Sequence, residues 1–149
     1  MLLPRLLQHT GSRARLILFA EPQWQQTLQQ VLINLISNAE DAMSESSERV
    51  LTVSTTVAGD DVAMSVRDTG RGMPPDVRRR VFEPFFTTKP AGVGTGLGLS
   101  VGFGIVQAHG GSIRGDTILN AQGQPAGARF TLLLPRGTPP TDLGTDTDT

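Results

Sequence analysis

Apolar residues recur at intervals of three and four along residues 23–43. This interval places them on one face of an α-helix, since about 3.6 residues complete each helical turn. Pro22 suits the first turn, where a helix does not need its amide hydrogen. The pattern therefore predicts an amphipathic helix whose buried face carries Leu28, Val31, Leu32, Leu35, Ile36, Ala39, Ala42 and Met43.

Patterns typical of β-strands lie on both sides of this helix. Residues 15–19 form a short apolar run, and residues 50–57 are rich in Val and Thr, which favour strands. Val62, Met64 and Val66 then alternate with other residues, after a turn at residues 59–61. Residues 50–66 are therefore predicted to form a β-hairpin.

A long connection rich in Gly and Pro follows at residues 69–98, with one short helical stretch near residues 75–82. Long connections in compact domains are usually functional lids or disordered. Residues 97–108 are apolar on nearly all sides, which predicts a buried helix that stops at Gly110 and Gly111. Two closing strands are expected at residues 112–114 and 128–134.

The order of these elements predicts an α+β fold with two layers, in which helices cover one face of a mostly antiparallel sheet. One domain is expected at residues 15–136. Residues 1–14 lack a clear pattern and are expected to be poorly ordered. Residues 137–149 are rich in Thr, Asp, Pro and Gly, so a disordered tail is expected there.

Composition excludes some classes of function but does not identify one. The chain has 149 residues, a formal net charge of −1 and no cysteine. We therefore expect no contact with nucleic acid or a membrane surface, no disulfide and no thiolate metal site. The Arg78–Arg80 run is interpreted as a solvated helix face. Without any apolar run of membrane-spanning length, the chain is expected to be soluble and cytoplasmic.

Asp68 is the residue with the most informative position. It continues the alternation of Val62, Met64 and Val66, so its carboxylate should point to their buried side. Burying a carboxylate is costly unless a partner compensates it. At the bottom of an apolar slot it could accept a hydrogen bond from the amine of adenine. The alternative is an Asp that ends a strand and starts an ordinary turn.

Asn34 and Asn38 lie one helical turn apart, at the border of the apolar face of the predicted helix. Asn is a poor helix former, so two of them within one helix call for an explanation. Their amides could offer oxygens to a hard cation and hydrogens to a phosphate. Two half-exposed polar residues without a ligand are the alternative.

Residues 92–100 form a glycine-rich loop that leads directly into the second long helix. Free backbone amides at such a helix start can bind an anion. Lys89 could reach a phosphate from the long connection. A flexible hinge and an ordinary exposed lysine are the alternatives. His9 and His109 lack the spacing of a metal site.

In this order the motifs resemble the catalytic domain of sensor histidine kinases, in the GHKL ATPase superfamily. Residues 30–42 resemble its asparagine box, residues 68–72 its first glycine box, residues 82–89 its phenylalanine box and residues 94–99 its second glycine box. Residues 127–132 are similar to its last strand. The sequences of the asparagine and phenylalanine boxes are most similar to those of nitrogen-regulatory and C4-dicarboxylate sensor kinases.

The resemblance implies a Bergerat-type sandwich with a mixed, mostly antiparallel sheet, in which Mg-ATP binds beneath a long lid. Asp68 would bind the adenine amine and Asn38 would coordinate Mg²⁺. Asn34, Asn38 and Lys89 would support catalysis. The full set of implied nucleotide contacts is Asn34, Asn38, Asp41, Asp68, Gly70, Gly72, Met73, Thr87, Thr88, Lys89, Gly94, Thr95, Gly96, Leu97, Gly98 and Leu99.

Three departures refine this expectation. Asn34 stands where hydrolytic relatives carry a glutamate, and an amide cannot act as a general base. Asp41 stands where some histidine kinases have a lysine that contacts phosphate, which Lys89 would replace. No histidine has the setting of a phosphoacceptor, since His9 lacks an acidic neighbour.

The implied function is transfer of the γ-phosphoryl group to a histidine on a separate dimerisation domain, upstream of a response regulator. The isolated domain is expected to be monomeric. Two alternatives remain: a nucleotide-sensing module without catalysis, and a serine kinase of the anti-sigma type.

Overall fold

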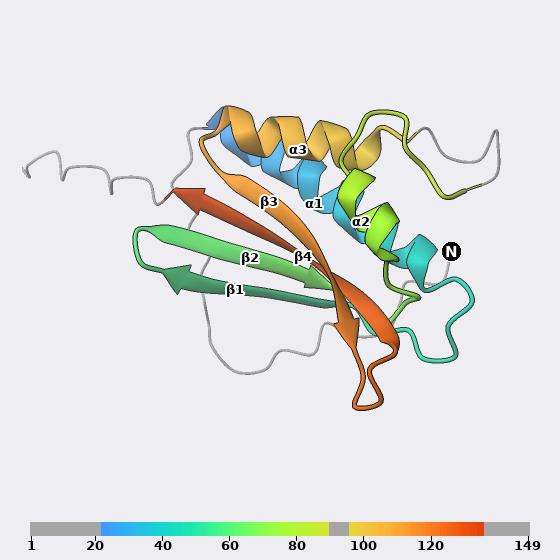
Figure 1. Ribbon diagram of the computed structural model, residues 1–149. Helices are drawn as coiled ribbons and strands as arrows, with labels where there is room; N and C mark the ends of the chain where they lie inside the picture. Colours follow the sequence, from blue (N-terminus) through green and yellow to red (C-terminus); the bar gives the residue numbers. More distant parts are fainter. Residues whose placement is uncertain (1–21, 90–95, 136–149) are drawn as a thin grey trace, which may run out of the picture.

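The computed structural model describes residues 22–89 and 96–135, and the side chains of residues 22–27 lie outside that description (Figure 1). The predicted strand at 15–19 and both predicted disordered ends lie outside the described residues. The elements are α1 (Pro22–Ala42), β1 (Thr52–Ala58), β2 (Asp61–Arg67), α2 (Pro75–Arg80), α3 (Gly98–Ala108), β3 (Ser112–Leu119) and β4 (Pro125–Pro135).

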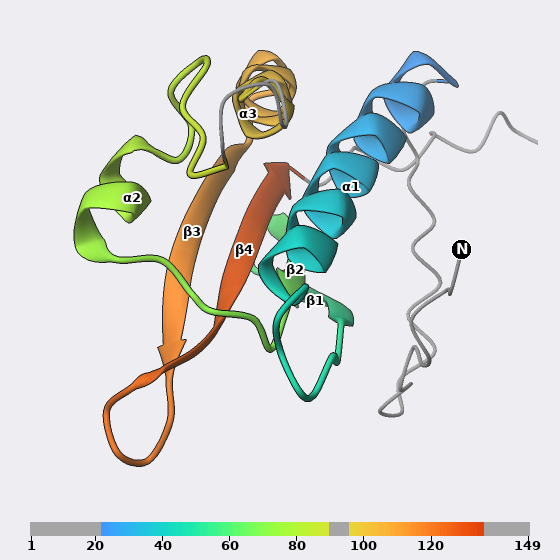
Figure 2. The same ribbon diagram turned by 90° about the vertical axis from the view of Figure 1, so that its right-hand side faces the viewer.

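The four described strands form one sheet in the order β1-β2-β4-β3. Every pairing among them is antiparallel. The helices α1 and α3 pack side by side across one face of this sheet (Figures 1 and 2). The predicted α+β fold with two layers is therefore confirmed. None of the described helices is long and apolar enough to cross a membrane.

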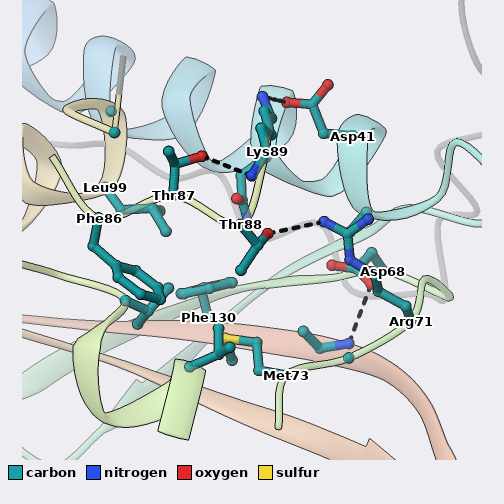
Figure 3. Close-up of a pocket in the computed structure, with 18 of the residues that line it drawn as sticks. Asp41, Asp68, Arg71, Met73, Phe86, Thr87, Thr88, Lys89, Leu99 and Phe130 are labelled. Atoms are coloured by element: carbon teal, nitrogen blue, oxygen red, sulfur yellow. Dashed lines mark hydrogen bonds and ion pairs between the residues drawn. The ribbon is translucent and has the colours of Figure 1, made fainter. Parts of the chain in front are cut away.

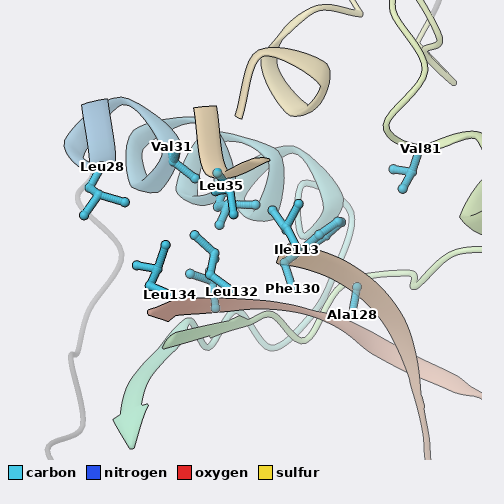
Figure 4. Packing of buried hydrophobic residues seen from close by; sticks show 11 residues of the cluster. Leu28, Val31, Leu35, Val81, Ile113, Ala128, Phe130, Leu132 and Leu134 are labelled. Carbon is cyan, nitrogen blue, oxygen red and sulfur yellow. The ribbon is translucent and has the colours of Figure 1, made fainter. Parts of the chain in front are cut away.

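The apolar face of α1 builds the core, as its periodicity predicts. Leu28, Val31 and Leu35 are buried and face the sheet (Figure 4). Across from them, β4 contributes Phe130, Leu132 and Leu134, all buried. Residues 62, 64 and 66 of β2 pair with residues 134, 132 and 130 of β4, so the inward-facing side chains of the two strands lie beside each other. The inner faces of the two central strands, β2 and β4, thus pack against the apolar face of α1.

The prediction of a buried second helix is wrong in its extent. Within α3 only Gly102 and Val106 are buried, and Val101 is 46% exposed. An apolar sequence does not guarantee burial, because one face of a helix in a two-layer fold meets solvent. Gly102 faces Val31 of α1, and a Cβ atom there would lie 3.6 Å from Val31, an ordinary van der Waals distance.

The closing strands are longer than predicted, reaching Leu119 in β3 and beginning at Pro125 in β4. Gly115 and Asp116 interrupt the apolar alternation of β3, so the sequence pattern underestimates its length. The side chain of Asn120 orders the turn between the strands by accepting hydrogen bonds from the amides of Gln122 and Gln124.

Candidate functional site

A cavity of about 750 Å³ lies between α1, α2, the start of α3 and the ends of β2 and β4 (Figure 3). Residues 86–89, in the loop that follows α2, also line it. Many predicted site residues, from four separate stretches of the chain, meet here: Asn34, Asn38, Asp41, Asp68, Gly72, Met73, Thr87, Thr88, Lys89, Gly96, Gly98 and Leu99.

Asp68 reaches the cavity from the end of β2 and is only 1% exposed. Its Oδ1 accepts hydrogen bonds from the amides of Gly70 (2.9 Å) and Ala128 (3.1 Å). Among the described residues no fully buried polar side-chain atom lacks a partner, so Oδ2 is not sealed from the cavity. The carboxylate is thus anchored by one oxygen and leaves the other for a ligand.

The charge state of Asp68 reflects opposing effects. Desolvation by burial raises the pKa of its carboxyl group above the ordinary value of 3.8, and this effect is the largest. The hydrogen bonds from Gly70 and Ala128, and the positive charge of Arg71, each lower the pKa. A ligand that donates a hydrogen bond to Oδ2 would favour the ionised form.

Two glycines allow the backbone to approach Asp68 closely. A Cβ atom at Gly70 would overlap the carbonyl oxygen of Ala42, at the end of α1. Gly127 has φ of 140°, and a Cβ atom there would overlap the carbonyl oxygen of Asp68. Gly70, a predicted nucleotide contact, is not among the residues that line the cavity. Its amide helps to hold the Asp68 carboxylate in place.

The asparagines of α1 differ in their surroundings. Asn34 donates from Nδ2 to the carbonyl oxygen of Gly98 (2.9 Å) and accepts at Oδ1 from Gln30 (2.8 Å). It therefore ties α1 to the start of α3. Asn38 lines the cavity and makes no side-chain hydrogen bond within the described ranges. The amide of Asn38 is the one that remains available to a ligand.

Two contacts join the loop after Phe86 to the rest of the cavity wall (Figure 3). Lys89 forms an ion pair with Asp41 in the last turn of α1. Arg71 donates a hydrogen bond to the hydroxyl of Thr88 at 3.3 Å. In this arrangement Lys89 stands at the mouth of the cavity.

The backbone at the end of the loop is shaped by Phe85 and Gly96. The amide of Phe85 donates to the carbonyl oxygen of Gly96 at 2.9 Å. Gly96 has φ of 68°, and a Cβ atom there would overlap the backbone of Phe85. Leu97, also a predicted contact, is not among the residues that line the cavity and occupies the N-cap position of α3. The predicted contacts Gly94 and Thr95 lie outside the described residues.

Sequence analysis identified Met73 and Leu99 but missed the other apolar residues that line the cavity. Phe130 comes from β4, and its ring packs edge-on against Phe82 with centroids 6.0 Å apart. Alternation along β4 could have placed Phe130 inward, but only the fold brings it beside Asp68. The other lining residues missed are Ser37, Ala42, Arg71, Pro74, Val77, Val81, Phe86 and Ala128.

The cavity therefore has two chemically different regions. Around Asp68 lie apolar side chains, among them Met73 and Phe130, which suit a flat ring carrying a hydrogen-bond donor (Figure 3). Toward the loop lie Asn38 and Lys89, which suit an anionic group with or without a cation. A ligand that combines a flat base with phosphates satisfies both regions.

Comparison with known proteins agrees with this chemistry. Residues 25–138 match the family model described as "Histidine kinase-, DNA gyrase B-, and HSP90-like ATPase". The sensor protein FixL of Bradyrhizobium diazoefficiens is 45% identical over 109 residues, which cover 72% of this chain and 20% of FixL. The sensor histidine kinase ZraS of Escherichia coli is 42% identical over 108 residues, covering 72% of this chain and 21% of ZraS.

Solved structures match at the level of the fold. The mycobacterial sensor histidine kinase MprB superimposes with a TM-score of 0.62 at 31% identity, covering 74% of this chain and 70% of that chain. ShkA, in a complex with AMPPNP, gives a TM-score of 0.61 at 34% identity, covering 76% of this chain and 22% of that chain. The chain spans only about a fifth of the length of FixL.

The family model covers most of the chain, and the curated and solved relatives place the same region in sensor kinases. The chain therefore belongs to the histidine kinase-, DNA gyrase B- and HSP90-like ATPase family, as the ATP-binding catalytic domain of a two-component sensor histidine kinase.

Proposed function

We propose that Mg-ATP binds in the cavity with the adenine amine donating a hydrogen bond to Asp68, and that the γ-phosphoryl group passes to a histidine on a separate dimerisation domain. The observation that carries this proposal is the anchoring of Asp68, whose Oδ1 holds two backbone amides while Oδ2 stays accessible. Met73 and Phe130 supply the apolar surroundings that strengthen such a bond.

Asn38 is the residue proposed to coordinate Mg²⁺. Its amide makes no hydrogen bond within the described ranges, and an amide oxygen is a suitable ligand for this hard cation. No cluster of three or more His, Cys, Asp or Glu that could hold a metal occurs among the described residues. The remaining ligands would then be phosphate oxygens and water, and the bound metal would neutralise phosphate charge.

Lys89 and the glycine-rich segment are proposed to hold the triphosphate. Lys89 already lies at the cavity mouth, where it can exchange the carboxylate of Asp41 for a phosphate. Thr87, Thr88, Gly96, Gly98 and Leu99 line the same region. Gly94 and Thr95 belong to this proposed set from the sequence alone.

Transfer is favoured over hydrolysis because the site lacks a general base at Asn34. The Asn34 amide is too weakly basic to take a proton from water, and its side chain is already held by hydrogen bonds with Gln30 and Gly98. In the proposed step an imidazole nitrogen of the partner bonds to the γ-phosphorus, and the bond to the β–γ bridging oxygen breaks to release ADP. Positioning and charge neutralisation are the contributions required of the protein.

The proposed partners follow from this reaction. They are the histidine-bearing dimerisation domain of the parent kinase and a response regulator downstream of it. The asparagine and phenylalanine boxes favour a parent of the nitrogen-regulatory or C4-dicarboxylate sensor type. We propose a cytoplasmic, monomeric domain that contacts neither nucleic acid nor membrane.

Transfer in trans tests the proposal. The chain is mixed with a purified histidine hairpin of its parent kinase and ATP labelled at the γ-phosphate, and Asn38→Ala serves as the inactive control. Acid-labile label on the hairpin is expected. Nucleotide binding without any labelled hairpin would instead support a sensing module, and acid-stable phosphoserine on a partner would support the serine-kinase alternative.

A further inference from the structure

The sheet has a second face, turned away from α1 and α3, which no described helix covers (Figure 1). Alternate residues of all four strands point to it. Strand register places Arg67 of β2 opposite Arg129 of β4, and Arg114 of β3 opposite Thr131 of β4. These residues line a hollow of about 380 Å³ on this face.

The charges on this face are not balanced within the described part of the chain. Arg67 and Arg129 are exposed, directly opposed register partners, and neither forms an ion pair there. Asp116 lies opposite Arg129, but its carboxylate binds Arg78 at 2.7 Å and Arg114 at 3.3 Å. Like charges directly opposite each other destabilise a sheet. The chain as a whole has a net charge of −1, so this positive charge is confined to one face of the sheet. An anionic partner would neutralise it.

The spacing of the arginines suggests the form of that partner. Arg114 and Arg129 lie on neighbouring strands two residues out of register, a diagonal of roughly 7–8 Å. In an extended polypeptide, alternate side chains project to the same side about 6.8 Å apart. Carboxylates at positions i and i+2 of such a segment match this diagonal.

We propose that this face is a docking site for an extended acidic polypeptide segment of a partner protein. Guanidinium groups would pair with its carboxylates, and the hydroxyls of Ser54, Ser65 and Thr131 would bond to its polar groups. A single phosphate would occupy only one of the three cross-strand rows that line this hollow. None of the described residues that line the hollow has an aromatic ring on which a nucleic acid base could stack.

A peptide titration tests the proposal on the full chain. The probes are a capped ten-residue peptide of alternating Glu and Ser and a matched peptide of alternating Gln and Ser, followed by amide chemical shifts of the ¹⁵N-labelled protein. The Glu peptide should shift residues around Arg67, Arg114 and Arg129 and bind more weakly as salt rises. The Gln peptide should leave them unmoved.

Two variants localise the effect. The double substitution Arg67→Gln with Arg129→Gln should weaken binding of the Glu peptide at least tenfold, with ADP affinity retained as the check on folding. Arg79→Gln removes the same kind of charge from the exposed surface of α2 and should leave binding unchanged. Equal binding by the double variant, or shifts that map elsewhere, overturns the proposal. So does a stronger response of the same residues to inorganic phosphate or duplex DNA than to the peptide at equal salt.

Discussion

The ammonium group of Lys89 forms an ion pair with the carboxylate of Asp41 across the mouth of the proposed nucleotide site. The side chains are 33% and 45% exposed, so solvent screens the pair and limits its strength. Such a weak contact suits a group that must exchange partners. The lysine can hold the loop in the absence of nucleotide and turn to a phosphate when one arrives.

Replacing Asp41 by Asn should tighten ATP binding. The change releases Lys89 and removes a negative charge beside the expected triphosphate, an effect of about 0.2–1 kcal/mol for an exposed pair. Calorimetric titration of Asp41→Asn, Lys89→Gln and the double variant measures it as a coupling energy. If Asp41→Asn gains as much in the Lys89→Gln background, the pair is not responsible.

Asp68→Asn should weaken the binding of adenine nucleotides by about 1–3 kcal/mol. The amide can present its hydrogens where the adenine amine needs an acceptor, which leaves a buried bond unmade. Titration with ADP measures the loss. Asp60→Asn makes the same change in the exposed β1–β2 turn and should have no effect. An unaltered ADP affinity in Asp68→Asn would remove this residue from the proposed site.

The pH dependence of stability should reveal the environment of Asp68. Burial raises the pKa of its carboxyl group in the folded state above 3.8, so the folded protein holds this proton more tightly than the unfolded chain. The contribution is fully present below pH 3.8 and is lost as pH rises through the folded-state pKa. Urea unfolding of the wild type and Asp68→Asn across this range measures the difference. Parallel profiles for the two proteins would contradict the prediction.

Nucleotide affinity should change with pH in the opposite sense. The ionised carboxylate accepts the bond from the adenine amine, so ADP affinity should rise as Asp68 loses its proton. The titrations can be repeated at the pH values of the unfolding series, and the rise should be absent in Asp68→Asn.

Asn38→Ala should abolish most of the effect of Mg²⁺ on ATP affinity. Loss of even an outer-sphere residue costs metal sites about 10–100-fold in affinity, so loss of a direct ligand should cost at least about tenfold. ATP affinity with and without Mg²⁺ gives the ratio. Asn34→Ala is the contrast, because losing the bond to Gly98 should weaken binding in both conditions. A normal Mg²⁺ response in Asn38→Ala assigns the metal to another residue.

Gly127→Ala should destabilise the fold beside the site. Its φ of 140° strains any residue with a side chain, and its Cβ atom would overlap the carbonyl oxygen of Asp68. The backbone strain alone costs about 1–3 kcal/mol. Gly59→Ala is the contrast, because Gly59 has φ of 61°, in the left-handed region that side chains adopt at lower cost, and no described residue lies within 4 Å of its Cβ position. Urea unfolding should show the larger loss for Gly127→Ala, and equal losses would rule out the overlap.

The alternation of apolar and polar residues predicted those elements that have one buried face and one solvent-exposed face. The spacing of Leu28, Val31 and Leu35 is enough to place α1 against the sheet, because one face of that helix is apolar and the other is polar. The same logic fails for α3, where apolar residues surround the helix and the sequence cannot tell which face meets solvent. There the tertiary structure decided, burying Gly102 and Val106 and leaving Val101 half exposed.

The sequence by itself determined that Asp68 points inward and which residue types could bind a ligand. Strand alternation and helical spacing act over only a few residues, so they can be read from the chain. Only the tertiary structure decided which residues act together. The amide of Ala128 that anchors Asp68 is 60 positions away, and Lys89 is 48 positions from Asp41. Such contacts depend on the register of β2 with β4 and on the path of the loop after α2, and no local periodicity encodes either.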